Sequence, residues 1–225
     1  MRKATLLLLM LAAMLNMNAQ TDDEYLMEIG GGVGFLGYLG DYNNVFTRDL
    51  QPMATLLVRR NLNPYMGLRL AASFGKLKGD ERDVKTVYPS TGVTPYSFSR
   101  TLTDVSLTYE YNFWPYGTGH DYYGAKRLTP FVFLGLGGTY AGGDGSSVFT
   151  ANVPIGLGLK YKVGQRMNVG VEWAMHFSMS DKLDGRKDPY GITSSGMFKN
   201  TDCYSVLQLT LSYSFMPKCT TCNKD

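Results

Sequence analysis

Two groups of residues in this sequence have types and spacings that could carry chemistry. Cys219 and Cys222 form a C-x-x-C pair near the end of the chain, which suits a redox dithiol, half of a metal site or a disulfide. His176 and Ser178 have the same parity as Glu172, and the three are the residue types of a base, a nucleophile and an orienting carboxylate. Whether either group can act depends on its compartment and on which face of a structural element it occupies.

The N-terminus indicates the compartment. Arg2 and Lys3 precede an apolar run that ends near Leu15, and small or polar residues follow it up to Ala19. This order is typical of a secretory signal peptide, and the run is shorter than the roughly 20 residues with which a helix crosses a bilayer. We therefore predict a signal peptide over residues 1–19 and export of the remaining chain.

Composition argues against several protein classes. The net charge of +3 and the pI of 8.6 are too mild to indicate a nucleic-acid partner. Three cysteines in 225 residues do not make the disulfide framework of a small secreted scaffold. The 26 glycines, 16 tyrosines and 13% aromatic residues are also unlike an ordinary soluble enzyme.

Apolar and polar residues alternate with a period of two along nearly the whole chain. The apolar set of one segment is Met167, Val169, Val171, Trp173, Met175 and Phe177, and the residues between them are polar or small. Eight segments show the pattern: 24–39, 51–61, 65–78, 100–113, 128–141, 148–163, 166–179 and 201–215. Each supplies the roughly 9–11 residues of a tilted transmembrane strand.

The connections between these segments alternate in length. Those at 61–64 and 164–166 are short, whereas those at 79–99 and 180–200 are long and polar. Short periplasmic turns and long outer loops are typical of outer-membrane barrels, although the connection at 115–127 is too long for a tight turn.

Aromatic residues support the same interpretation. They gather at the strand ends that would lie near the inner membrane interface, and the last strand closes on an aromatic residue. These residues are Tyr25, Tyr65, Tyr111, Phe113, Trp114, Tyr161, Tyr213 and Phe215. We predict an all-β fold, an eight-stranded antiparallel transmembrane β-barrel of the outer-membrane type, over residues 20–215.

The predicted barrel has a polar interior. A closed sheet pairs every backbone group in hydrocarbon, and a barrel of eight strands is filled by its own side chains. Charged residues of both signs occupy the inward parity, as ion pairing in such an interior requires. The predicted lumen network comprises Glu28, Arg59, Arg69, Glu110, Lys160, Lys162, Glu172 and His176.

The inward parity argues against catalysis by His176 and Ser178. Lipid-modifying chemistry needs these groups at the lipid-facing surface or the rim, where an acyl chain can reach them. A G-x-G-x-x-G match within residues 30–40 continues as a strand and opens no helix, so it is not a dinucleotide fingerprint. We expect no catalytic residue, cofactor or metal site.

An even number of strands returns the chain to the periplasm, an oxidising compartment, so the tail at 216–225 is predicted there. A zinc site would need a second pair of ligands nearby, but Cys203 is predicted at the opposite end of the last strand. Nothing indicates the helix N-terminus that activates a redox C-x-x-C. A local disulfide between Cys219 and Cys222, forming a docking knob, or a fastening to a partner remains.

Stretches along nearly the whole mature chain resemble one known family. They are D-E-Y-L-M-E-I-G-G-G-V-G-F-L-G-Y-L-G-D, R-R-N-L-N-P-Y-M-G-L-R-L, N-V-G-V-E-W-A-M-H-F-S-M-S-D-K-L-D and S-F-M-P-K-C-T-T-C, in that order. The sequence resembles the PorG-type outer-membrane proteins of the type IX secretion and gliding machinery. This resemblance implies a non-catalytic barrel that associates with a periplasmic ring of lipoprotein and partner subunits and is not the translocation channel.

The tail and the segment 115–127 are the predicted periplasmic segments long enough to reach a partner, and aromatic residues often dominate interfaces. The candidate partner-binding residues are Lys218, Cys219, Thr220, Cys222, Trp114, Tyr116, Tyr122 and Tyr123. In one alternative, these aromatic residues form an interfacial belt with a loose turn. In a third, Lys126 and Arg127 bind phosphates of the lipid headgroups.

We predict a structural outer-membrane component of type IX secretion that anchors or positions the periplasmic ring complex. The expected partners are the ring subunits and outer-membrane lipid, without nucleic acid. In one alternative, the outer loops at 79–99 and 180–200 bind a ligand or another cell. In a further alternative, the barrel is a lipid-modifying hydrolase that uses His176 and Ser178.

Overall fold

The computed structural model describes residues 25–39, 49–80, 97–119, 124–143, 146–180, 183 and 202–217. Several predictions fall outside these residues: the signal peptide at 1–19, most of the two long loops, Tyr122, Tyr123, and Lys218, Cys219, Thr220 and Cys222 of the tail. No helix in the described part of the chain is long and apolar enough to cross a membrane.

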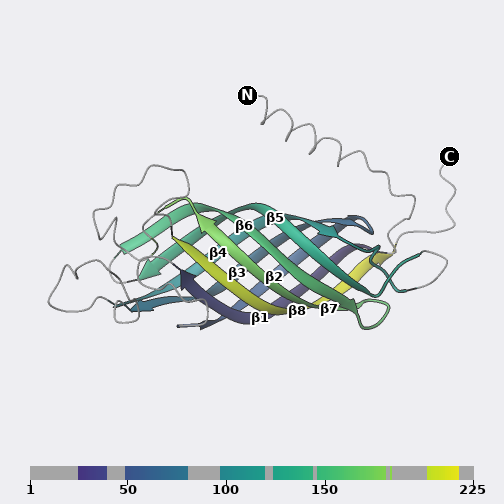
Figure 1. The fold of residues 1–225 in the computed structure, drawn as a ribbon, viewed down its shortest axis with the longest axis horizontal. Helices are drawn as coiled ribbons and strands as arrows, with labels where there is room; N and C mark the ends of the chain where they lie inside the picture. The colour runs from purple at the N-terminus through teal and green to yellow at the C-terminus, as the bar shows by residue number, and fades with distance from the viewer. Residues whose placement is uncertain are drawn as a thin grey trace, which may run out of the picture.

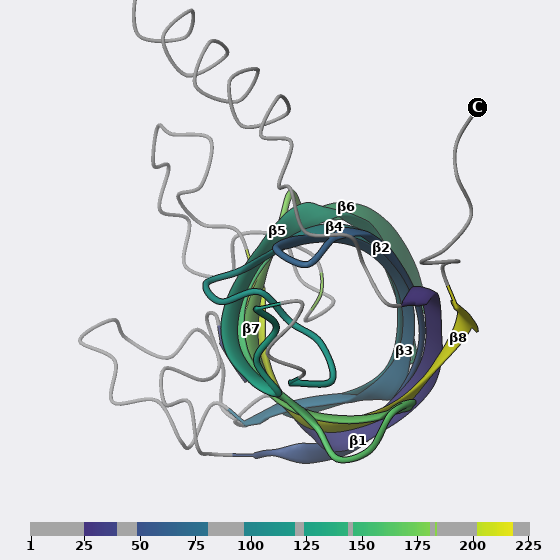
Figure 2. The same cartoon turned by 90° about the vertical axis from the view of Figure 1, so that its right-hand side faces the viewer.

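Eight antiparallel strands form one closed barrel, in which each strand pairs with its neighbours in sequence and β1 pairs with β8 (Figures 1 and 2). They are β1 (Tyr25–Leu39), β2 (Gln51–Asn63), β3 (Met66–Asp80), β4 (Ser97–Asn112), β5 (Leu128–Gly143), β6 (Ser146–Lys162), β7 (Met167–Ser178) and β8 (Cys203–Pro217). The predicted fold class is confirmed, and β3 and β4 extend farther than the predicted segments because Asp80 pairs with Ser97.

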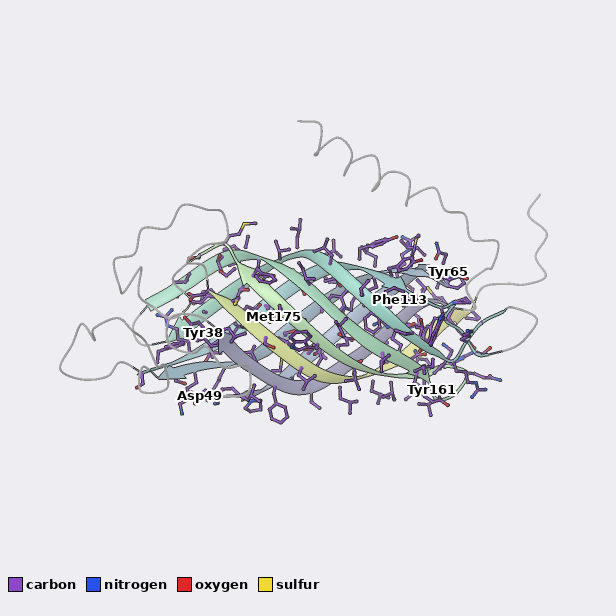
Figure 3. All side chains as sticks on the ribbon, viewed as in Figure 1. Tyr38, Asp49, Tyr65, Phe113, Tyr161 and Met175 are labelled. Atoms are coloured by element: carbon purple, nitrogen blue, oxygen red, sulfur yellow. The ribbon has the colours of Figure 1, made fainter. Side chains whose placement is uncertain are left out.

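The two ends of the barrel differ in their connections. β1 begins and β8 ends at the same end, where Tyr25 pairs with Pro217. We call it the turn end, because the short connections at 64–65 and 163–166 also lie there, and we call the opposite end the loop end. Figure 3 shows Tyr65, Phe113 and Tyr161 together at the turn end.

The outward face carries an apolar band around the barrel (Figure 3). Its most exposed members include Val33 at 64%, Leu56 at 65% and Leu136 at 68%. An apolar surface that surrounds the whole sheet is unfavourable in water and favourable in hydrocarbon. The barrel is therefore of the transmembrane, outer-membrane type.

The apolar band ends before the strands do. On β3, outward Leu70 and Phe74 are followed toward the loop end by exposed Lys76 and Lys78. On β4, outward Val105 is followed by Thr103, Thr101, Ser99 and Ser97, of which Thr103 is half-buried and the others are exposed. Strands β3 and β4 thus continue beyond the hydrocarbon into water at the loop end.

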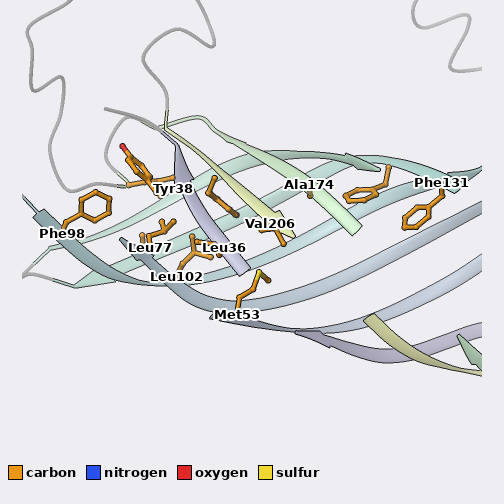
Figure 4. Packing of buried hydrophobic residues seen from close by; sticks show 13 residues of the cluster. Leu36, Tyr38, Met53, Leu77, Phe98, Leu102, Phe131, Ala174 and Val206 are labelled. Carbon is orange, nitrogen blue, oxygen red and sulfur yellow. The ribbon is translucent and has the colours of Figure 1, made fainter. Parts of the chain in front are cut away.

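The interior of the loop-end half contains an apolar cluster that was not predicted from the sequence. Leu36, Tyr38, Leu77, Phe98 and Leu102 are each at most 2% exposed and form one cluster inside the barrel (Figure 4). Once a strand leaves the hydrocarbon, its outward face meets water, so apolar side chains gain by turning inward. On β3 and β4 the inward and outward faces therefore exchange polarity toward the loop end.

Small residues make room for large ones in the middle of the lumen. A Cβ atom on Gly156 would lie 2.3 Å from the ring of Phe133, and one on Gly158 would lie 2.7 Å from the ring of Phe131. These two rings stack with centroids 5.9 Å apart. The inward glycines of β6 therefore allow two phenylalanines to fill the interior.

Candidate functional site

An ionic ladder fills the turn-end half of the lumen. Arg59 Nη1 lies 2.6 Å from Glu28 Oε2, and Arg59 Nε lies 2.8 Å from Glu110 Oε2. Arg69 continues the ladder, with Nε 3.2 Å from Glu110 Oε1 and Nη1 2.6 Å from Glu172 Oε2. All five side chains are at most 5% exposed, so the ladder joins the strands through buried ion pairs.

Glu110 is the centre of the ladder. It pairs with both arginines and also with Lys160, whose ammonium group contacts Oε2 and lies 4.2 Å from the centroid of the Phe131 ring. The strand register contributes to this arrangement, because Gly67 of β3 stands opposite Glu110 and the side chain of Arg59 packs over Gly67. A buried charge is tolerated when opposite charges pair with it, and Glu110 has three cationic neighbours.

The structure places all the residues of the predicted lumen network inside the barrel. Lys162 lies nearest the turn end, where its ammonium group contacts Asn168 Oδ1 at 3.0 Å. His176 lies closer to the loop end, and its imidazole stacks on the ring of Tyr204 with centroids 4.5 Å apart. Its Nδ1 is 3.8 Å from Asp104 Oδ1.

A second polar cluster surrounds Asp104 at the boundary with the apolar interior. Asp104 Oδ2 accepts hydrogen bonds from Thr139 at 3.1 Å, Asn152 at 2.5 Å and Tyr204 at 3.0 Å. Asp104 has the same parity in the sequence as Glu110, but it was not among the residues predicted for the lumen network. On β4, Asp104 lies between outward Thr103, which is polar, and outward Val105, which is apolar. This change of polarity in the sequence could have identified Asp104.

His176 and Ser178 do not meet as a base and a nucleophile at the lipid surface. Ser178 is fully buried, and its Oγ donates to the backbone oxygen of Ser180 at 3.1 Å and lies 3.3 Å from Thr150 Oγ1. The lipid-facing position on the same strand belongs to Trp173, which is 40% exposed. This arrangement suits structural roles for both residues.

The β4–β5 connection folds back over the turn end. Tyr116 forms an isolated parallel bridge with Lys126, and its backbone nitrogen donates to Pro64 O at 3.0 Å. The hydroxyl of Tyr116 donates to Asn168 Oδ1 at 2.9 Å, inside the barrel. Burial and the charge of Glu28 raise the pKa of the Tyr116 phenol. This connection, over residues 113–119 and 124–127, is called the turn-end cap below.

The two candidate aromatic anchors that the structure describes, Tyr116 and Trp114, lie differently in the cap. Tyr116 points into the barrel mouth, with Lys162 Nζ 5.4 Å from its ring centroid and its hydroxyl bonded to Asn168. Trp114 is 41% exposed and carries Lys126 Nζ 4.8 Å from its ring centroid. The parity of the strands gave no information on this segment, because it follows neither period.

Solved outer-membrane proteins have a similar fold. Neisserial surface protein A is 12% identical, with a TM-score of 0.49, over 84% of this chain and 97% of that chain. OprG from Pseudomonas aeruginosa is 12% identical, with a TM-score of 0.48, over 88% and 99% of the two chains. A major outer membrane protein from Thermus thermophilus is 13% identical, with a TM-score of 0.48, over 84% and 98%.

No curated protein shows significant sequence similarity to this chain. A family model does match, and the match extends over residues 2–224, which is nearly the full length. The chain therefore belongs to the family described as domain of unknown function DUF6089.

Proposed function

We propose that this protein is a non-catalytic outer-membrane component of the type IX secretion machinery, where it anchors or positions the periplasmic ring complex. The observation that carries the proposal is the filled lumen. The ionic ladder occupies one half and the apolar cluster the other, so the described residues leave no continuous aqueous path. A barrel filled in this way acts through its ends and its outer surface.

The turn end supports the anchoring role because two candidate contact segments start there. The cap is fixed to the barrel through Pro64, Asn168 and Thr129, the last of which accepts from Trp114 N at 3.1 Å. Strand β8 ends at Pro217, so the C-x-x-C tail follows from the same end of the barrel as the cap. A fixed platform beside a tail suits a protein partner, since preorganised surfaces lose little entropy on binding.

In-cell photocrosslinking tests this proposal. A photoreactive residue is introduced at Trp114 in the cap and, separately, at Thr220 in the tail, with probes at Lys76 and Gly92 of the loop end as controls. A discrete adduct to a periplasmic ring subunit from either turn-end position, and none from the controls, is the expected result. Adducts from the loop-end positions alone would contradict the anchoring role and its orientation.

The loop end supports a second candidate function, in which the outer surface binds a ligand or another cell. Strands β3 and β4 extend beyond the apolar band and display Lys76, Lys78 and Ser99 on a wall that is exposed to water. Shortening the loop at 81–96 distinguishes the two functions. Loss of ligand or cell binding after this deletion, with secretion unchanged, favours the second candidate.

A further inference from the structure

The exposed charges in the described part of the turn end have one sign. Among the residues that the structure describes, the exposed charged side chains at this end are Arg60, Lys126, Arg127 and Arg166. The described carboxylates nearest to them, Glu28 and Glu110, are buried in the lumen and paired with Arg59. The described part of this rim is therefore cationic, at the level where the apolar band meets water.

Arg166 is held at the edge of the apolar band by two tyrosines. Its Nη1 donates to Tyr213 Oη at 2.9 Å, and its guanidinium carbon lies 5.8 Å from the ring centroid of Tyr25 and 6.0 Å from that of Tyr213. Tyr213 is 41% exposed and faces outward from β8. Interfacial tyrosines lie at the headgroup level, so the guanidinium is held at that level too.

Arg60 lies on the other side of β1. It is an outward residue of β2, paired in register with Met27 of β1 and Leu68 of β3, and it follows the apolar outward residue Val58. A long cationic side chain in this position extends along the barrel surface to reach the headgroups. Arg60 and Arg166 thus lie on either side of the start of β1 and the end of β8, with Tyr25 between them.

Apolar surface for an acyl chain continues directly from this pair of arginines. Ile29 of β1 is 52% exposed, and it pairs with Tyr213 of β8. Leu211, two residues before Tyr213 on β8 and closer to the loop end, is also 52% exposed. A cationic site that adjoins an apolar surface complements a phospholipid, which joins a charged headgroup to apolar acyl chains.

We propose that Arg166 and Arg60 form a phospholipid site at the start of β1, where they bind the phosphate of a headgroup in the leaflet at the turn end. Guanidinium groups suit this ligand because they donate paired hydrogen bonds to phosphate oxygens. The acyl chains lie on Ile29 and Leu211. This site does not depend on a role in secretion, so either proposal can fail without the other.

Lipid binding to the whole mature barrel tests the proposal. The protein is refolded in zwitterionic micelles and titrated with short-chain phosphatidylglycerol while the side-chain NMR signals of its arginines are followed. We expect the Arg166 and Arg60 signals to shift together. Arg166→Gln should weaken binding about fivefold, the usual effect of one basic side chain at a lipid surface.

Three further measurements decide between sources of the effect. Lys76→Gln removes one charge at the loop end and should leave the affinity unchanged. Tyr213→Phe removes the hydroxyl that holds Arg166 and should weaken binding by a smaller factor than Arg166→Gln. Unchanged affinity in Arg166→Gln overturns the site, and displacement of the lipid by equimolar inorganic phosphate reassigns it to a soluble phosphate compound and overturns the lipid assignment.

Discussion

The turn-end and loop-end halves of β4 use the same alternation of side chains in opposite senses. On the turn-end half of β4, Leu107 and Val105 face outward while Glu110 faces inward. On its loop-end half, Thr101 and Ser99 face outward while Leu102 and Phe98 face inward, with buried Arg100 between them. The backbone has no preference between these arrangements, so the solvent that surrounds each half decides which face is apolar.

The comparison also shows how each half holds its own interior together. The turn-end half depends on paired charges, which are costly to bury and costly to leave unpaired. The loop-end half depends on apolar packing of the kind found in soluble proteins. Four substitutions test this division, and each is paired with a matched control.

Glu110→Ala should have the largest effect, because it leaves Arg59, Arg69 and Lys160 without their shared carboxylate. Removal of one partner of a buried ion pair costs about 3–5 kcal/mol, and here three cations lose a partner. Denaturant unfolding in lipid vesicles measures the loss of stability. Lys76→Ala, at an exposed cation outside the lumen, should change the midpoint little; equal losses for the two variants would contradict the ladder.

Leu102→Ala tests the loop-end interior. Leu102 is fully buried in the apolar cluster, and truncation of a buried leucine costs about 2–5 kcal/mol. Thr103→Ala, one residue away on the outward face, should cost much less. Hydrogen exchange separates the two halves, because faster exchange should concentrate in the loop-end parts of β3 and β4, whereas uniform loss of protection would show that the halves do not differ.

Leu107→Arg and Thr101→Arg locate the hydrocarbon boundary on β4. Leu107 is 48% exposed within the apolar band, where an arginine costs about 2–4 kcal/mol at the bilayer midplane. Thr101 faces outward beyond the band, so the same substitution there should change stability little. Folding into vesicles measures both, and equal costs at the two positions would place the whole of β4 in one solvent.

The sequence predicts the barrel well because the alternation of side chains that indicates each strand is a local feature. Parity identified every strand and placed Glu110, Arg69 and Glu172 inside, since successive side chains of a strand face opposite sides. The exchange of polarity at Asp104 was also visible in the sequence, but a uniform strand pattern was assumed. The cap lay beyond this reasoning, because the inward direction of Tyr116 depends on contacts with Pro64 and Asn168 that are distant in the chain.

The smallest predicted effect concerns the link between the loop-end interior and the β7–β8 connection. Tyr38 Oη donates to Asp202 Oδ1 at 2.6 Å, and Leu183 N donates to Asp202 Oδ2 at 2.8 Å. Tyr38→Phe removes only the first contact and should cost about 1.5–3 kcal/mol, the value of a hydrogen bond to a charged group. Its effect should appear as faster hydrogen exchange at Leu183, with the turn-end ladder unaffected. Thr139→Val, which removes a hydroxyl from the cluster around Asp104, is the control and should leave exchange at Leu183 unchanged; equal acceleration in both variants would show that the connection is not held through Tyr38.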